Sequence, residues 1–350
     1  MKKPKKLKKG DKVAIVSLSS GIAGDKEFAH RYEIGKKRLE EEFGLKVITM
    51  PNALIGSSKV YLHPELRAKD LMDAFNDKSI KAVLCNIGGD DTVRILPYID
   101  FEVLRKNPKI FMGYSDTTIN HFMLYKAGIV SYYGPSIMAE FAENVKMHDY
   151  TKNSVLSTLF KSSKGYKIVS SKSWTSELLT WMNPKNNYIQ RKMIEEKKNI
   201  EVLQGSKNIE GVLIGGCIDT FHMFIGSEIW PKTGWKNKIL FLETSEDKPD
   251  PGFISQILRN PLFSDVLKQV KGVIIGKPFN EVYYEEYKKA YLDVIQKELN
   301  LRELFIGYNY NFGHTAPMCI LPIGINVRIN IVDGSIEFLE SATEEEEDEK

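Results

Sequence analysis

The feature that most restricts the fold of this chain is a regular alternation of strand-like and helix-like segments in its first half. Short apolar runs, such as "KVAIV" at 12–16 and "IKAVLC" at 80–85, are each followed by a stretch with apolar residues at helical spacing. Strand–helix–strand units of this length produce a parallel sheet with helices on both faces. Ligands bind such sheets beyond the carboxyl ends of the strands, so we expect a site formed by the loops "SLSSG", "IGGDDT" and "GYSDTT".

The pattern changes after about residue 165. The stretch at 173–206 contains two tryptophans, a proline and many polar residues without a sustained period, which predicts a long connection or a lid. Strand patterns then resume, and the last ones are joined by a "DG" turn that is typical of antiparallel pairing. We therefore expect an α/β fold of two domains. The predicted parts are an N-terminal domain at 1–165, a connection or substrate loop at 166–205, a C-terminal domain with more antiparallel strands at 206–343 and an acidic tail at 344–350.

Composition excludes several classes of protein. A formal net charge of +3 is too small to indicate a nucleic-acid or membrane-surface partner, and the lysine-rich first nine residues are interpreted as a solvated tail rather than an RNA-binding arm. No apolar run approaches the length of a membrane span, and no signal-peptide pattern is recognisable. Three widely spaced cysteines in apolar surroundings indicate reduced thiols, which favours the cytoplasm.

Ser115 lies between an apolar strand and a helix in the stretch "KIFMGYSDTTIN". A serine at such a junction has its hydroxyl beyond the sheet edge, beside the free N–H groups of the helix start. That geometry presents a nucleophile, but it also describes an ordinary helix N-cap. The local sequence leaves both interpretations open.

A serine nucleophile requires a base and an acid that orients it. His314, in "NFGHTAP", differs from the other histidines because it lies in a glycine-preceded turn that enters a strand. Glu243 ends an apolar strand and shares the inward face with Ile239 and Phe241, so its carboxylate needs a partner. A structural salt bridge would satisfy Glu243 equally well, and Glu246 or Asp247 could be the functional acid instead.

Backbone N–H groups could form an oxyanion hole near Ser115. The candidates are the amide of Asp116 and one from the Gly88–Gly89 pair, although a Gly-Gly turn after a strand could also bind phosphate. The chain has no H-E-x-x-H, no paired cysteines, no histidines at ligand spacing, no G-x-G-x-x-G and no P-loop. We therefore expect neither a metal nor another cofactor.

Taken together, "GYSDTT", "FLETSED" with "PGFISQILRN", "GVIIGKP" and "FGHTAP…LPIG" resemble, in this order, the LD-carboxypeptidase family of serine peptidases. The resemblance covers about residues 10–340. It implies a flavodoxin- or Rossmann-like N-terminal domain that carries the serine, and a C-terminal domain that carries the acid and the base. By motif, the implied triad is Ser115, Glu243 and His314, with the oxyanion held by Asp116 and by Gly88 or Gly89, usually in a homodimer.

The family has two branches, and both act on small-molecule substrates. One removes the terminal D-alanine from murein tetrapeptides, and the other, the microcin C self-immunity branch, hydrolyses aminoacyl-nucleotide conjugates. The insert with Trp174 and Trp181 resembles the second branch, in which a loop tryptophan stacks on adenine. We interpret Trp174 as a packing residue, whereas Trp181 could either contact the substrate or pack the domain junction.

"GGCIDT" departs from the Asn-Leu expected in many relatives after the two glycines, because it has Cys217 and Ile218. If this segment lines the pocket, the substrate preference is shifted. The leading prediction is a serine hydrolase of the self-immunity type. The alternatives are a murein tetrapeptide LD-carboxypeptidase and, from a different class, a non-catalytic ligand-binding protein on the same fold.

Overall fold

The computed structural model describes residues 1–344, so most of the expected acidic tail lies outside the described residues. Its first sheet has the strand order β14-β5-β4-β3-β1-β2, and β1 to β5 run parallel, as the alternation predicted. The strands of this sheet are β1 (Lys12–Val16), β2 (Lys46–Thr49), β3 (Ile80–Cys85), β4 (Ile110–Gly113), β5 (Ser131–Tyr133) and β14 (Leu321–Ile323).

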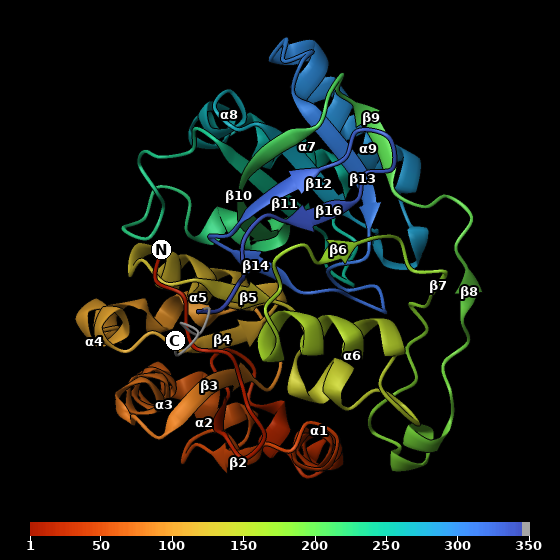
Figure 1. The fold of residues 1–350 in the computed structure, drawn as a ribbon. Helices are drawn as coiled ribbons and strands as arrows, with labels where there is room; N and C mark the ends of the chain where they lie inside the picture. The colour runs from red at the N-terminus through yellow and green to blue at the C-terminus, as the bar shows by residue number, and fades with distance from the viewer. Residues whose placement is uncertain (345–350) are drawn as a thin grey trace, which may run out of the picture.

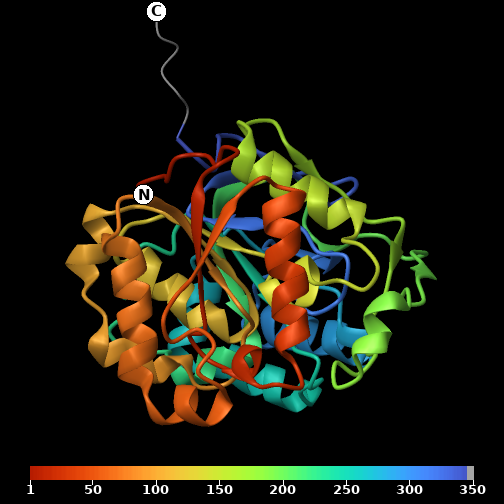
Figure 2. The same cartoon turned by 90° about the horizontal axis from the view of Figure 1, so that it is seen from below.

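Helices cover both faces of the first sheet (Figures 1 and 2). Along β1, Val13 and Ile15 belong to one buried cluster, and Ala14 and Val16 belong to the other, which is the alternation expected of a strand buried on both sides. The first cluster includes residues of α1 (Ala29–Glu41) and α6 (Asp149–Val155). The second includes residues of α3 (Pro64–Asn76) and α5 (Thr118–Lys126).

The stretch at helical spacing that follows residues 80–85 was expected to be an α-helix, but the structure has a 3-10 helix there, at Thr92–Tyr98. Pro97 lies inside this segment, where it has no N–H to donate and restricts the chain. A new helix, α4 (Phe101–Lys106), then begins at Asp100, whose carboxylate accepts from the N–H groups of Glu102 and Val103. The other short helix of this half is α2 (Ser57–Leu62).

The second sheet has the order β6-β16-β15-β10-β11-β12-β13-β9. Its centre, β10 to β13, is parallel, and its two margins are antiparallel, so the expected mixture of pairings is confirmed. The strands are β6 (Lys167–Ile168), β9 (Glu201–Gln204), β10 (Ile209–Cys217), β11 (Lys238–Glu243), β12 (Gly272–Gly276), β13 (Phe305–Tyr310), β15 (Asn326–Ile329) and β16 (Ile336–Phe338). The helices of this half are α7 (Pro251–Arg259), α8 (Pro261–Leu267) and α9 (Tyr284–Leu292).

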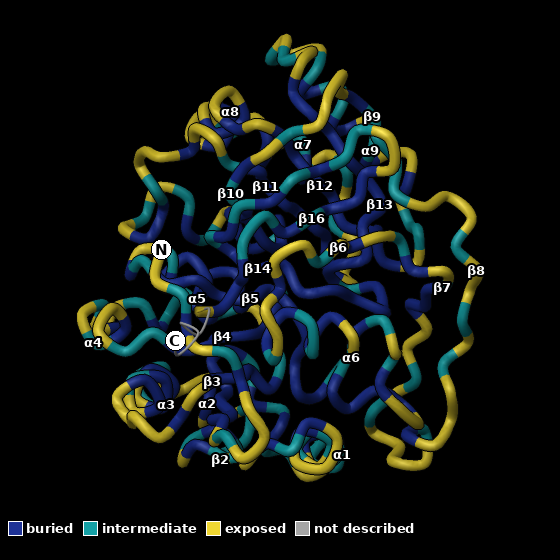
Figure 3. Tube along the Cα trace, in the orientation of Figure 1, coloured by how far each residue is buried: buried dark blue, intermediate teal, exposed yellow. Residues whose placement is uncertain are grey.

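One strand of the C-terminal half belongs to the N-terminal sheet. The last strands were expected to pair with each other, but β14 pairs antiparallel with β5, and only β15 and β16 form the expected antiparallel pair. The two halves also share a core, since the ring of Phe122 on α5 lies 4.7 Å from that of Phe224 and 6.0 Å from that of Trp230. Figure 3 shows this interior as a continuous buried region.

The connection between the halves runs along one edge of the molecule and is largely exposed (Figures 1 and 3). It holds a two-residue ribbon, β7 (Ser173–Trp174) with β8 (Ile194–Glu195), and a 3-10 helix at Pro184–Tyr188. Trp174 is buried, as expected of a packing residue, and Trp181 is half-buried. Among residues 1–344, no helix is both long enough and apolar enough to span a bilayer.

Candidate active site

Ser115 lies at the carboxyl end of β4, in a tight turn before α5. Its φ is +63°, a left-handed conformation that is strained for a residue with a side chain and that marks the turns presenting a nucleophile. Thr117, and not Ser115, occupies the N-cap of α5. Of the two interpretations of this serine, the backbone therefore favours the nucleophile.

Glu243 and His314 form a buried pair next to this turn. Glu243 ends β11, is fully buried and accepts a hydrogen bond from Nδ1–H of His314 to Oε2 at 2.7 Å. Gly313 makes the approach possible, since its φ is +92° and a Cβ there would lie 2.5 Å from Oε2 of Glu243. With Nδ1 bound to the acid, the imidazole can exchange protons only through Nε2.

Tyr133 joins this pair to the serine, and the sequence analysis did not find it. Its hydroxyl donates to Oε1 of Glu243 and accepts a 3.1 Å hydrogen bond from the backbone N–H of Ser115. Its position at the end of β5 could have indicated a place in the site. Because β4 and β5 are neighbouring parallel strands, their carboxyl ends lie at the same edge of the sheet. Tyr133 thus fixes the acid and the serine backbone relative to each other.

The space beside the Ser115 hydroxyl exists because residue 88 is glycine. A Cβ on Gly88 would lie 3.0 Å from Oγ of Ser115 and 3.4 Å from the backbone nitrogen of Asp116. An oxygen atom in this space would thus be close to both the hydroxyl and that amide. Gly89 has φ +151° and packs on Ser19, so this turn also requires glycine. The carboxylate of Asp116 points elsewhere and accepts from Oγ of Ser19 at 2.6 Å.

Charged groups surround the imidazole of His314. Nε2 lies 3.1 Å from Oε2 of Glu246, so a second carboxylate contacts the nitrogen opposite Glu243. Burial acts to lower the pKa of His314, but the carboxylates of Glu243 and Glu246 outweigh it and raise the pKa to about 9. Tyr114 packs edge-on against the ring, with centroids 5.0 Å apart. At neutral pH, the imidazole in this arrangement is charged.

The thiol of Cys217, a carboxylate oxygen of Glu243 and a ring nitrogen of His314 lie within 4.8 Å of one another. This donor set has the chemistry of a zinc site. However, burial and the neighbouring Glu243 and Asp219 carboxylates raise the pKa of Cys217 well above its ordinary value, which keeps the thiol protonated. Glu243 and His314 already engage each other, so the group fits a hydrogen-bonded acid–base pair better than a metal centre.

Two pockets meet at His314. One lies beside Ser115 and is lined by Gly88, Gly89, Ser115, Cys217 and Glu246, among others. The other extends under the connection and is lined by Trp181 together with residues of the N-terminal half. Tyr114, Glu246 and His314 border both pockets, so they form the boundary between the serine and the tryptophan.

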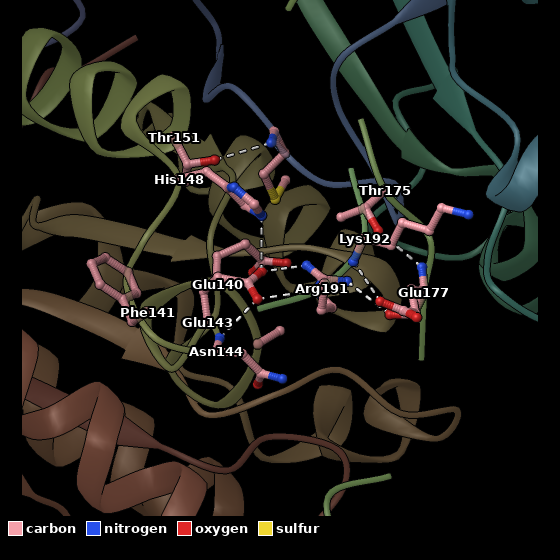
Figure 4. Close-up of polar contacts among 12 residues, drawn as sticks. Glu140, Phe141, Glu143, Asn144, His148, Thr151, Thr175, Glu177, Arg191 and Lys192 are labelled. Atoms are coloured by element: carbon pink, nitrogen blue, oxygen red, sulfur yellow. Dashed lines mark hydrogen bonds and ion pairs between the residues drawn. The ribbon is translucent and has the colours of Figure 1, made fainter. Parts of the chain in front are cut away.

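Figure 4 shows the polar wall of the second pocket. Arg191 donates to both oxygens of the buried Glu143, with Nε 3.0 Å from Oε1, and His148 lies 3.2 Å from the same carboxylate. Arg191 also donates to the carbonyl of Glu177 at 3.3 Å, while the backbone N–H of Lys192 donates to the Glu177 side chain. These contacts join the two ends of the segment around Trp181 to each other and, through Arg191, to Glu143 of the N-terminal half.

Trp181 is held by its neighbours as well as by packing. The guanidinium of Arg31 lies 4.8 Å from the centroid of the indole ring, and His30 Nε2 lies 2.8 Å from the Trp181 carbonyl. One face of the indole is therefore occupied by a cation. A planar ligand would have to use the other face.

The structure thus places Ser115, His314, Gly88 and Gly89 on one pocket, with Glu243 directly behind His314 and the Asp116 amide beside the Gly88 space. Trp181 lies on the second pocket. Of the alternative acids, Glu243 takes Nδ1 of His314, and Glu246 contacts Nε2. Asp247 lies on the same loop as Glu246 and is exposed.

Known proteins share this arrangement of two halves. The chain is similar over 94% of its length to the MccF-like protein from Streptococcus pneumoniae solved in complex with AMP, with 35% identity, 98% of that chain covered and a TM-score of 0.85. It is 27% identical to the microcin C7 self-immunity protein MccF of Escherichia coli, with 95% of this chain and 94% of MccF covered. It is 26% identical to the Bacillus subtilis protein named "Probable murein peptide carboxypeptidase", over 95% and 92% of the two chains.

Family models give the same assignment. The LD-carboxypeptidase N-terminal domain matches residues 13–134, which include Ser115, and the LD-carboxypeptidase C-terminal domain matches residues 210–329, which include Glu243 and His314. The resemblance seen in the sequence motifs is therefore confirmed. The chain belongs to the LD-carboxypeptidase family of serine peptidases.

Proposed function

We propose that this hydrolase acts through an acyl-enzyme on Ser115, with His314 as the base and Glu243 as the acid that orients it, on aminoacyl-nucleotide conjugates of the self-immunity type. The observation that carries the proposal is the hydrogen bond between the buried Glu243 and His314, together with the strained backbone of Ser115, which lines the same pocket as His314. A binding protein on this fold would need neither the strained serine nor the buried acid–base pair.

In the proposed reaction, neutral His314 accepts the Ser115 hydroxyl proton at Nε2 while Oγ forms a bond to the substrate carbonyl carbon. The oxyanion is held by the Asp116 amide and by an amide of Gly88 or Gly89. As the intermediate collapses, the bond to the leaving group breaks and Nε2 returns the proton to that group. Water then repeats the sequence on the acyl-enzyme, so the products are a free acid, the leaving group and unchanged enzyme.

Two observations support a nucleotide in the second pocket. Trp181 lines it with one indole face not covered by Arg31, and stacking of a base on an aromatic ring contributes about 1–3 kcal/mol. The similar Streptococcus pneumoniae protein was solved with AMP. Because the chain is also similar to the Bacillus subtilis protein named "Probable murein peptide carboxypeptidase", murein peptides are the alternative substrate class.

The test is a paired hydrolysis assay with the wild-type protein and the Ser115→Ala variant. One substrate is aspartyl sulfamoyl adenosine, and the other is a murein tetrapeptide that ends in D-alanine. We expect cleavage of the adenosine conjugate that is lost by at least about 10³-fold in Ser115→Ala. Cleavage of the tetrapeptide alone would assign the protein to the murein branch, and no serine-dependent cleavage of either would favour the binding protein.

A Trp181→Ala variant then tests the nucleotide subsite. We expect KM for the adenosine conjugate to rise about tenfold or more while kcat changes little, because a stacked base contributes to binding and not to the chemical step. An unchanged KM would mean that Trp181 only packs the connection. The homodimer expected from the family and the cytoplasmic location stay predictions, and light scattering on the purified protein tests the first.

A further inference from the structure

Glu246 contacts the ring nitrogen of His314 that the proposed base uses for catalysis. Its Oε2 lies 3.1 Å from Nε2 of His314, which is the nitrogen that must accept the proton of Ser115. With Glu243 on Nδ1, the imidazole has a carboxylate at each nitrogen. An imidazolium donating from both nitrogens cannot accept a proton. The structure is therefore that of a resting site.

The two carboxylates differ in how firmly they are held. Glu243 is fully buried and bound by Tyr133, so it cannot leave His314 without exposing unpaired groups. The Glu246 side chain is 51% exposed, lies in the turn after β11, and has no second hydrogen bond or ion pair within residues 1–344. Glu246 can therefore move away at little cost, whereas Glu243 cannot.

None of the other groups around His314 among the described residues could take the role of Glu246 at Nε2. Asp219 faces it from the segment after β10, but its Oδ2 accepts from the backbone N–H of Ser245 at 3.2 Å. Cys217 is a protonated thiol, and Tyr114 presents a ring edge. Glu246 is thus the one carboxylate, among the described residues, that both contacts Nε2 and is free to turn away.

The pocket beside Ser115 indicates what would draw Glu246 away. Asp90, Asp219, Glu246 and Asp247 line it, and no lysine or arginine of the described residues does. A cationic group of a bound substrate would therefore find carboxylates there, and the only cation of the pocket lining with which it competes for Glu246 is the His314 imidazolium. An ammonium group offers three N–H donors and a full charge, which matches what the imidazolium provides to Glu246 in the resting site.

We propose that Glu246 is a substrate-operated switch: it pairs with His314 in the free enzyme and transfers to an ammonium group on the acyl part of the bound substrate. This proposal rests on the proposed function of Ser115 and His314. When Glu246 leaves, the Nε2 proton passes to solvent, and His314 becomes a neutral base that faces the serine. The same contact then positions the acyl group, so Glu246 is a positioning and specificity residue.

The first experiment measures the release of the base without any substrate. A fluorophosphonate probe labels the serine only when His314 can take its proton, so the labelling rate rises with pH through the pKa of His314 in the free enzyme. In Glu246→Gln, we expect the midpoint to fall by about one pH unit or more. Glu286→Gln removes another exposed carboxylate, from α9, and should leave the midpoint in place.

The second experiment measures recognition of the ammonium group with matched substrates. Alanyl and propionyl sulfamoyl adenosine differ only in an α-ammonium, and tetrapeptides with lysine or norleucine before the D-alanine differ only in a side-chain ammonium. On the scaffold that is cleaved, we expect the wild type to prefer the charged partner at least about tenfold in kcat/KM. Glu246→Gln should lose that preference and cleave the uncharged partner at least as fast as the wild type, because no carboxylate then holds the proton on Nε2 of His314.

The outcomes separate this proposal from the function on which it rests. If the wild type is not labelled at Ser115 and cleaves none of the substrates, the proposed hydrolase mechanism fails. If the wild type is labelled and active but Glu246→Gln keeps both the midpoint and the preference, the switch is wrong and the hydrolase stands. A shifted midpoint with an unchanged preference overturns the transfer to ammonium. Glu246→Ala must reproduce the result, and its circular dichroism must match the wild type.

Discussion

Tyr133 shows how one hydroxyl can connect the parts of a site that the two halves supply. It donates to Glu243 from the C-terminal half and accepts from the N–H of Ser115 in the N-terminal half. Without it, one oxygen of a fully buried carboxylate loses its donor, and the strained serine turn loses its acceptor. The residue should matter for both stability and rate.

We expect Tyr133→Phe to lower the free energy of unfolding by about 1–3 kcal/mol, because a buried charged acceptor loses a hydrogen bond. We also expect kcat/KM to fall by about tenfold or more, since Glu243 and Ser115 are no longer fixed relative to each other. Urea unfolding and steady-state kinetics measure the two effects.

Tyr132→Phe is the matched control for this change. Tyr132 is the preceding residue of the same strand and is equally buried, but its hydroxyl donates to the carbonyl of Ala342 on the other face of the sheet. It should cost stability with little effect on rate. If kcat/KM fell equally in both variants, Tyr133 would have no specific role in the site.

At this scale, the sequence identified candidates where chemistry and local pattern agreed. Ser115, Glu243 and His314 became candidates through their positions at a strand end or in a glycine turn, and the family motifs favoured them over the alternatives. Tyr133 and the Glu246 contact could not, because both depend on which strand or loop lies beside which side chain. Glu246 was considered only as an alternative acid, and its place on Nε2 follows from the turn after β11.

Polar contacts hold the connection at 166–205 in place against the N-terminal half. Its middle is exposed, and Arg191 attaches it to the buried Glu143 (Figure 4). Burial acts to raise the pKa of Glu143, but His148 and Arg191 lower it to about 2. Because this pKa is depressed on folding, the stabilisation is complete above the ordinary value of 4.5 and is lost as the pH falls toward 2.

We expect Arg191→Ala to destabilise the protein by about 3 kcal/mol at neutral pH, because it removes the guanidinium that pairs with the buried Glu143 carboxylate and leaves only His148 and the backbone N–H of Asn144 as its partners. The effect should shrink as the pH is lowered from 4.5 toward 2. The segment around Trp181 should also exchange its amide hydrogens faster, since Arg191 no longer binds the carbonyl of Glu177. Hydrogen exchange and pH-dependent unfolding measure both effects.

Arg328→Ala is the control for this element. Arg328 pairs with Glu210 and Glu337 on an exposed strand surface, where such pairs contribute little. No change in exchange around Trp181 is expected from it. An Arg191→Ala protein that also leaves that segment protected would contradict the attachment described here.

Periodicity could not predict the shape of this connection, because its residues are fixed by contacts with distant parts of the chain. The ribbon β7–β8 is two residues long on each strand, too short for an alternation to be visible. The opposite case is the parallel core of the first sheet, where continuous apolar runs and apolar residues at helical spacing made the elements recognisable.

The whole molecule behaves as one packed unit in spite of its two sheets. Phe122 packs on Phe224 and Trp230 across the junction, and β14 completes the first sheet from the second half. The domain boundaries expected from composition stay a prediction. They did not anticipate this exchange, because the sequence of a three-residue strand does not indicate which strand it pairs with.

We therefore expect a single cooperative unfolding transition, with matching calorimetric and van't Hoff enthalpies. Leu321→Ala, in fully buried β14, should lower the free energy of unfolding by about 2–5 kcal/mol and move the transition without splitting it. Calorimetry with near-ultraviolet and far-ultraviolet circular dichroism checks this. Two separate transitions in the wild type would show that the halves unfold independently.

The pairing of β14 with β5 also determines when the first sheet can be completed during synthesis. During synthesis, Ser115 and the strands β1 to β5 leave the ribosome first, but the edge of β5 stays unpaired until residues 321–323 follow. An open edge is a hazard for association with other nascent chains. Because Glu243 and His314 are translated in the same late portion, the nascent chain acquires the proposed acid–base pair and its closed sheet edge together.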